Sequence, residues 1–182
     1  MKILLAAIII VFSFTSTSKS AEFSDLFGIK LLVSVENYFN LNLINKTKYK
    51  NGETTANFFD VDVTNNINKK SPQIEFYSLT IDNDGIVHGI MGQAEIDTIS
   101  NCNERIAPSI LGIFERKYSL NFDYYESSTT WGSIYSYSLW DNNVNLLRIQ
   151  CNAGNDGYTF LQIIYQTSEL LDAVDKFYDS GF

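Results

Sequence analysis

The residues that could carry catalysis are few, and they begin with one histidine, His88. A nucleophile–histidine–acid triad needs this imidazole as its base, and a zinc site of the usual kind needs several such ligands. His88 lies in the apolar segment 86–90, and the chain has no Gly-x-Ser-x-Gly motif to hold a nucleophile. The sequence therefore favours a strand histidine that faces solvent or is hydrogen-bonded, and it predicts no catalytic residue, no metal site and no cofactor.

The clearest pair of carboxylates is Asp60 and Asp62. Side chains two residues apart in a strand point to the same face, where two carboxylates could share acid–base work or hold a cation. The pair alternates with Phe59, Val61 and Val63, and this period of two is typical of a strand with one face in the core and one in water. The alternation favours a solvated strand face, and catalysis by the pair stays open as the alternative.

Aromatic residues are the one surplus in the composition, with 13 Phe, 11 Tyr and 2 Trp. In an expected strand over residues 131–139, the side chains of Trp131, Tyr135 and Tyr137 share one face. Tyr and Trp combine an apolar body with a polar tip, as contact surfaces for proteins and for sugars require. We take these three residues as the candidate binding surface, and the alternative is that the row packs under a helix as core.

The chain has two cysteines, Cys102 and Cys151. In an exported protein, an even pair most simply forms one disulfide, which in the chain-entropy model would stabilise the fold by about 4 kcal/mol. The paired spacing of a metal site is missing, and two catalytic thiols would need a base near them. The sequence predicts a disulfide between Cys102 and Cys151.

The first twenty residues have the layout of a secretory signal peptide. Lys2 gives a positive start, residues 3–12 are an unbroken apolar run, and residues 13–20 are small and polar. The apolar run is too short to span a membrane, and cleavage is expected before Ala21. We therefore expect residues 1–20 to be a cleaved signal peptide and residues 21–182 to form a single domain, periplasmic or secreted.

Charge and composition limit the partners. The formal net charge is −8, and removal of Lys2 and Lys19 with the signal peptide would make it −10. So few scattered cations give no basic patch for nucleic acid, and the rest of the chain has no apolar segment long enough for an integral membrane segment. The many Asn and Ile residues, which have AT-rich codons, favour a bacterial source.

The expected elements alternate between hairpins and helices. The Asp-Gly pair within residues 82–85 predicts a hairpin of strands 74–81 and 86–96, and Gly89 and Gly92 suggest a bulge or a close backbone approach. Asn101 and Glu104 form a capping-box signature. Other expected elements are a strand over 26–32, a helix capped by Ser34, a strand near 59–64, a helix over 102–118, strands over 131–139, 144–152 and 158–165, and a C-terminal helix.

This order is not the strand–helix alternation of a parallel sheet. It predicts an α+β fold in which helices pack on one face of an antiparallel sheet. A strand–helix–hairpin unit occurs twice in the expected order, so the domain could consist of two diverged halves.

Three short patches also occur in small exported bacterial proteins. They are residues 27–31 (Phe-Gly-Ile-Lys-Leu) before a Ser-capped helix, a helix from Cys102 to Tyr118, and a later strand with a paired cysteine. The chain thus resembles small exported bacterial α+β proteins, and is similar in the same way to outer-membrane assembly lipoproteins and the β-lactamase-inhibitor protein. The resemblance implies an α+β fold without a catalytic motif. The lipobox cysteine of the lipoproteins is missing, which argues against a role in membrane assembly.

The sequence favours an exported, non-enzymatic domain that binds a partner, most simply a protein, through Trp131, Tyr135 and Tyr137. The first alternative is an exported hydrolase that uses Asp60 and Asp62 on a cell-wall or glycan substrate. The second is a small-ligand binder with its pocket between sheet and helices.

Overall fold

A computed structural model of the chain describes residues 23–49, 57–129, 132–141, 145–154 and 156–179. The expected signal peptide and Trp131 lie outside the described residues. Among the described helices, none is long and apolar enough to cross a membrane.

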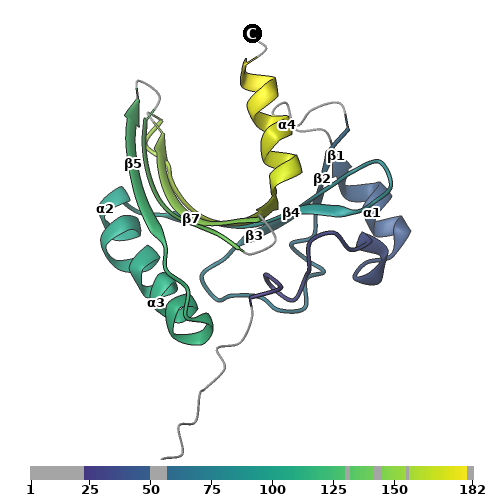
Figure 1. Ribbon diagram of the computed structural model, residues 1–182, viewed down its shortest axis with the longest axis horizontal. Helices are drawn as coiled ribbons and strands as arrows, with labels where there is room; N and C mark the ends of the chain where they lie inside the picture. The colour runs from purple at the N-terminus through teal and green to yellow at the C-terminus, as the bar shows by residue number, and fades with distance from the viewer. Residues whose placement is uncertain (1–22, 50–56, 130–131, 142–144, 155, 180–182) are drawn as a thin grey trace, which may run out of the picture.

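The centre of the fold is an eight-stranded sheet in which every neighbouring pair is antiparallel (Figure 1). The strand order is β1-β2-β3-β4-β8-β7-β6-β5. The predicted α+β class with an antiparallel sheet is therefore confirmed. The strands are β1 (Lys48–Tyr49), β2 (Phe59–Asp62), β3 (Phe76–Ile81), β4 (Val87–Ile96), β5 (Asp123–Thr129), β6 (Gly132–Trp140), β7 (Asn145–Gly154) and β8 (Thr159–Thr167).

The sheet consists of two meanders, β1–β4 and β5–β8, which join through the pairing of β4 with β8. A helix precedes each meander, α1 (Leu41–Thr47) the first and α3 (Ala107–Tyr118) the second. Two halves are thus visible in the topology, but each is a helix followed by four strands rather than a strand, a helix and a hairpin. The difference arises from β1 and β5, which the sequence analysis did not expect.

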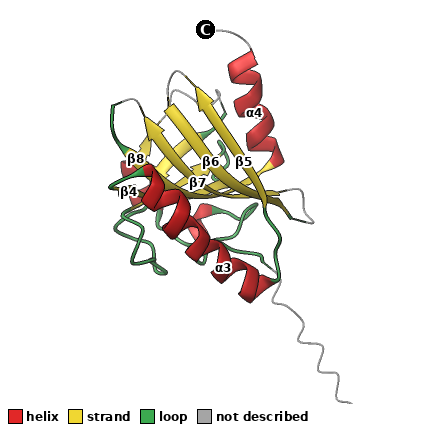
Figure 2. Ribbon diagram, turned by 90° about the vertical axis from the view of Figure 1, so that its left-hand side faces the viewer, coloured by secondary structure: helices red, strands yellow, loops and turns green. Residues whose placement is uncertain are grey.

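The sheet curves strongly, and its convex face carries the core (Figures 1 and 2). Residues paired across antiparallel strands share a face, so the register assigns one continuous apolar layer to this side. That layer packs against α3 and the N-terminal segment. Its fully buried members include Leu79, Ile90, Leu147, Ile149 and Leu161.

The C-terminal helix α4 (Ser168–Asp179) stands on the opposite, concave face (Figure 1). The expectation that the helices share one face is therefore wrong for this helix. Gly89 explains its position: a Cβ there would lie 2.9 Å from a methyl carbon of Leu170, so the bare backbone of β4 makes room for the start of α4. A close approach at Gly89 is present, but a side chain, that of Leu170, makes it rather than another backbone.

The expected bulge is also present in the β3–β4 hairpin. Thr80 pairs with Gly89 and Ile81 pairs with Val87, so His88 is an extra residue in β4. The predicted hairpin is confirmed, and the Asp82 carboxylate fixes its turn by accepting the N–H groups of Asp84 and Ile86, each at 2.9 Å. A bulge redirects side chains locally, and here it redirects His88.

The helix expected over 102–118 begins three residues earlier. It starts as α2 (Ile99–Asn101), continues as the π-helical turn η2 (Cys102–Ile106) and ends as α3. The Thr98 hydroxyl, rather than the Asn101 side chain, accepts the capping N–H. Pro108 lacks an N–H and its ring crowds the preceding turn, which accounts for the wider π-helical winding before it.

The N-terminal segment differs more from expectation. Residues 26–32 form a turn closed by the bridge between Leu26 and Ile29 instead of a strand, because Phe27 and Gly28 both have positive φ. The helix expected after Ser34 is divided into η1 (Val35–Asn37) and α1, which Asn40 caps separately.

Candidate functional site

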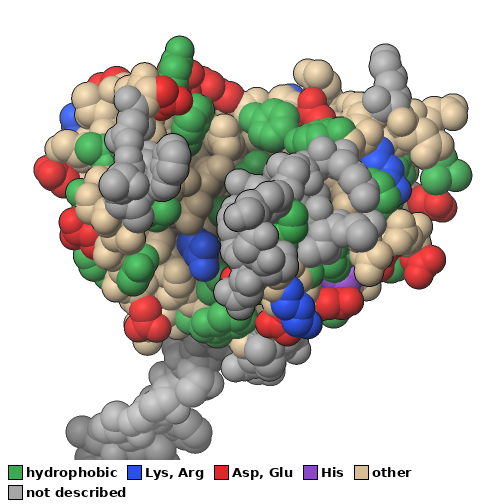
Figure 3. Space-filling model, turned by 90° about the horizontal axis from the view of Figure 1, so that it is seen from above, with side chains coloured by type: hydrophobic (Ala, Val, Ile, Leu, Met, Phe, Trp, Pro, Cys, Tyr) green, Lys and Arg blue, Asp and Glu red, His purple; other side chains and the backbone are tan. Residues whose placement is uncertain are grey.

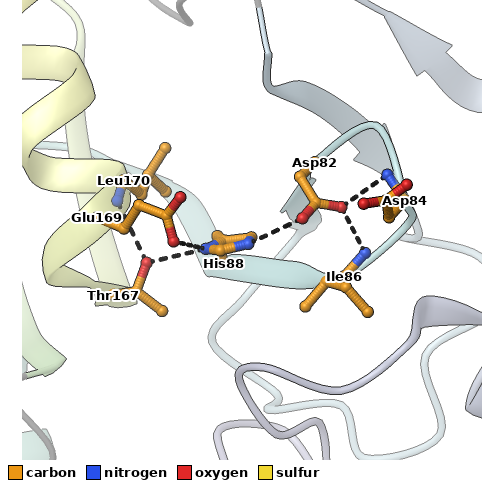
Figure 4. Close-up of polar contacts among 7 residues, drawn as sticks. All are labelled: Asp82, Asp84, Ile86, His88, Thr167, Glu169 and Leu170. Carbon is orange, nitrogen blue, oxygen red and sulfur yellow. Dashed lines mark hydrogen bonds and ion pairs between the residues drawn. The ribbon is translucent and has the colours of Figure 1, made fainter.

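His88 lies at the centre of a buried polar cluster that spans the hairpin turn and the start of α4 (Figure 4). Its side chain is nearly inaccessible, with 4% of the residue exposed. Nε2 lies 3.2 Å from Oδ2 of Asp82, and Nδ1 lies 3.2 Å from the Thr167 hydroxyl and 3.6 Å from Oε2 of Glu169. Phe58 packs edge-on against the imidazole with its ring centroid at 5.2 Å.

Thr167, His88 and Asp82 thus have the order of a nucleophile, a base and an acid. Two observations argue against catalysis. Thr167 is itself 4% exposed, and its hydroxyl accepts the N–H of Leu170 at 3.2 Å as a cap for α4. The cluster joins α4 to the hairpin. His88 is thus a buried, hydrogen-bonded strand histidine.

Asp60 and Asp62 lie on the concave face, opposite Thr80 and Ser78 of β3. Asp60 is buried and accepts the Thr80 hydroxyl at 2.7 Å, whereas Asp62 is half-buried and accepts the N–H of Thr64 at 2.9 Å. The pair does share a face, but Asp60 is not on a freely solvated surface as the alternation suggested. Both carboxylates are engaged in local hydrogen bonds.

Tyr135 and Tyr137 lie on the convex face, opposite Cys151 and Ile149. Both are half-buried against the core, and the Tyr137 hydroxyl donates to Oδ1 of Asn103 at 3.3 Å. Burial raises the pKa of Tyr137 above its usual range. Their role as contacts for a partner stays a prediction. In the structure, both pack against the core, and Tyr137 also links β6 to η2 through Asn103.

The predicted disulfide is confirmed. Cys102 in η2 and Cys151 in β7 are joined across a sequence separation of 49, with Cα atoms 5.9 Å apart. The bond fastens the π-helical turn to the convex face of the sheet.

Two exposed aromatic residues beside the predicted row belong to β5, which the sequence analysis missed. Tyr124 and Tyr125 are 51% and 61% exposed on opposite faces of this outermost strand. The ring of Tyr124 contacts that of Tyr137, with centroids 5.1 Å apart. The signal for β5 was present as aromatic side chains in residues 122–125, but polar residues on either side concealed the strand period.

Uncharged polar side chains from three adjacent strands, β4, β8 and β7, meet on the concave face. Gln162 on β8 donates to Gln93 on β4 at 2.7 Å and accepts from Gln150 and Asn152 on β7 at 2.6 and 2.8 Å. These four side chains form an amide row across the sheet. Where α4 rises from this face, the residues that line a cleft of about 400 Å³ include Arg148 and Ile164 from the sheet and Leu171 from the helix.

The described residues contain no group of three or more His, Cys, Asp or Glu side chains that could hold a metal ion. Comparison of the chain with protein-family models, with curated proteins and with solved structures finds no significant match.

Proposed function

We propose that residues 21–182 form an exported, non-enzymatic domain that binds an extended segment of a partner protein along the edge of β5. The observation that carries this proposal is the position of β5, which is seven residues long, is the last strand of the sheet, and has exposed tyrosines on both faces.

An edge strand presents a row of backbone N–H and C=O groups that another extended chain can pair with. Tyr124 on one face and Tyr125 on the other are placed to pack on alternate side chains of an added strand. Tyr residues are enriched among the residues that dominate protein interfaces. Tyr124 is also held in place, because its hydroxyl donates to Glu126 at 3.2 Å and its ring rests on Tyr137.

The hydrolase alternative has less support. Acid–base catalysis needs a carboxylate within reach of a substrate proton, whereas Asp60 is buried and hydrogen-bonded to Thr80. A search for a partner is therefore the more informative experiment.

The test is affinity capture from an envelope extract with tagged residues 21–182, followed by hydrogen–deuterium exchange on the purified complex. We expect one stoichiometric protein partner and slower exchange of the β5 amides, because a paired edge no longer opens to water. The Tyr124→Ala/Tyr125→Ala variant should retain less than about a tenth of the captured partner.

Tyr158→Ala is the matched control, because Tyr158 is equally exposed but precedes β8. Capture that survives the β5 double change, or a complex that leaves β5 exchange unaltered, would refute the proposal. Sedimentation of the isolated protein distinguishes self-association: a dimer that the double change abolishes would assign this edge to a second copy instead.

A further inference from the structure

Two buried side-chain atoms in the described part of the chain lack a hydrogen-bond partner, and both belong to the concave face of β7. They are Nε of Arg148, a donor, and Oδ1 of Asn152, an acceptor. Residues four apart in a strand share a face and lie about 13 Å apart. Buried polar atoms are nearly always paired, so one face with both an unpaired donor and an unpaired acceptor suggests a ligand.

The Arg148 side chain is held in an environment that disfavours its charge. It lies in the cleft under α4, beside Leu171 and Val174, and no carboxylate of the described residues lies within ion-pair distance of it. Burial lowers the pKa of its guanidinium, and Asp175 on α4 partly offsets this effect. A guanidinium in such a cleft favours a carboxylate, which it can bind through two parallel hydrogen bonds.

The other side chains around Arg148 on the concave face are suited to bind hydroxyl groups of a ligand. Ser138 of β6 pairs with Arg148, and Gln150, two residues further along β7, lies in the amide row that ends at Asn152. Amide side chains donate and accept at once, as hydroxyl ligands do. Trp140, which is 53% exposed and follows Ser138 by two residues on the same face, offers a flat apolar surface beside them.

Figure 3 looks onto this side of the molecule. The cleft that contains Arg148 is lined mostly by uncharged residues, with Asp60 and Asp175 as its two carboxylates. The geometry points to a binding site for a short sugar acid, with its carboxylate on Arg148 and its hydroxyls along the row to Asn152. The site lies on the interior strands of the concave face and is separate from the β5 edge.

The test is calorimetric titration of residues 21–182 with galacturonate and its dimer and trimer. Galactose serves as the neutral probe and octanoate as the apolar acid. We expect the acidic sugars to bind, with affinity rising from monomer to trimer, and galactose to bind at least about tenfold more weakly because it lacks the carboxylate. Octanoate binding in preference to the sugars, or no binding by the folded protein, would overturn the assignment.

Arg148→Met should weaken sugar-acid binding by about 10- to 100-fold, while Arg116→Met on the exposed side of α3 should leave it unchanged. Arg148→Lys keeps the charge without the bidentate geometry and should weaken binding about tenfold. Asp175→Asn removes a negative charge that would repel the carboxylate of the bound sugar acid, so it should tighten binding. Unchanged affinity in both Arg148 variants would refute the site.

The melting temperature of the ligand-free protein distinguishes a binding role from a structural one. Because its buried Nε is unpaired, replacing Arg148 by Met should raise that temperature, as is common where a site is built for function rather than stability. A lower melting temperature would mean that Arg148 supports the fold, and it would overturn the proposal.

Discussion

His88 shows how one inserted residue can connect distant parts of the chain. The bulge in β4 redirects its imidazole between Asp82 in the hairpin turn and Thr167 before α4. With Nε2 protonated, the ring donates to Asp82 and accepts from the Thr167 hydroxyl, which in turn accepts the N–H of Leu170. The polar groups that link Asp82, His88, Thr167 and Leu170 then each have a partner, and α4 is fixed at its first turn.

Replacement of His88 by Leu should lower the free energy of unfolding by about 2–3 kcal/mol, because Asp82 and Thr167 would each lose a buried partner. Urea denaturation measures this loss. Hydrogen exchange should speed up selectively in α4, because its N-terminal attachment is lost.

Asn83→Ala in the same exposed turn is the control and should change stability by less than about 0.5 kcal/mol. A small effect of His88→Leu, with unaltered exchange in α4, would contradict the structural role and return attention to chemistry at this cluster.

Among the elements, β4 depends on two positions without side chains. Gly89 accommodates Leu170 on the concave face, and a Cβ at Gly92 would lie 2.7 Å from the Phe27 ring on the convex face. Phe27 is held there by a positive φ and by edge-on contact with Tyr77 at 4.9 Å. The strand is thus approached closely from both sides, and each glycine is required by a different neighbour.

Gly92→Ala should destabilise the fold by about 1–3 kcal/mol, because the new methyl group displaces the Phe27 ring. In a Phe27→Ala background the same change should cost less than about 0.5 kcal/mol, and chemical denaturation of all four proteins gives the coupling between the sites.

Gly112→Ala in α3 provides the comparison. Its Cβ would meet only the flexible end of Arg116, and the helix should gain up to about 1 kcal/mol. Equal costs of Gly92→Ala in both backgrounds would mean that Phe27 is not the obstacle.

For the whole molecule, two features hold the two meanders in one body. The first is the β4–β8 pairing, which joins the halves through the middle of the sheet. The second is the Cys102–Cys151 disulfide, which ties the helical connection between the halves to the convex face of β7. The concave face is left to α4 and to the amide row, and the site proposed for a sugar acid lies there.

The Cys102→Ala/Cys151→Ala variant should lose about 4 kcal/mol of stability, because the unfolded chain regains the entropy of an open loop with a separation of 49. Urea denaturation of the variant and of the reduced wild type should give matching losses. A loss below about 1 kcal/mol in both would mean that packing alone holds η2 on the sheet.

The local sequence pattern was enough to predict the features that depend only on residues close together in the chain. The Asp82 turn with its apolar flanks predicted the β3–β4 hairpin, Gly89 and Gly92 indicated the bulge in it, and the cysteine count predicted the disulfide. A turn, a strand period and the absence of a side chain act within a few residues, so they can be read from the chain directly.

The tertiary structure alone placed β5, the strand order, and α4 on the concave face. Gln93 and Gln162 meet because β4 pairs with β8 across many intervening residues, and no local period specifies such a pairing. Arg148 and Asn152 likewise look like ordinary polar positions of an alternating strand. Only the tertiary structure, including α4 above Arg148, buries one polar atom of each side chain, and that burial marks the unpaired donor and the unpaired acceptor as a candidate site.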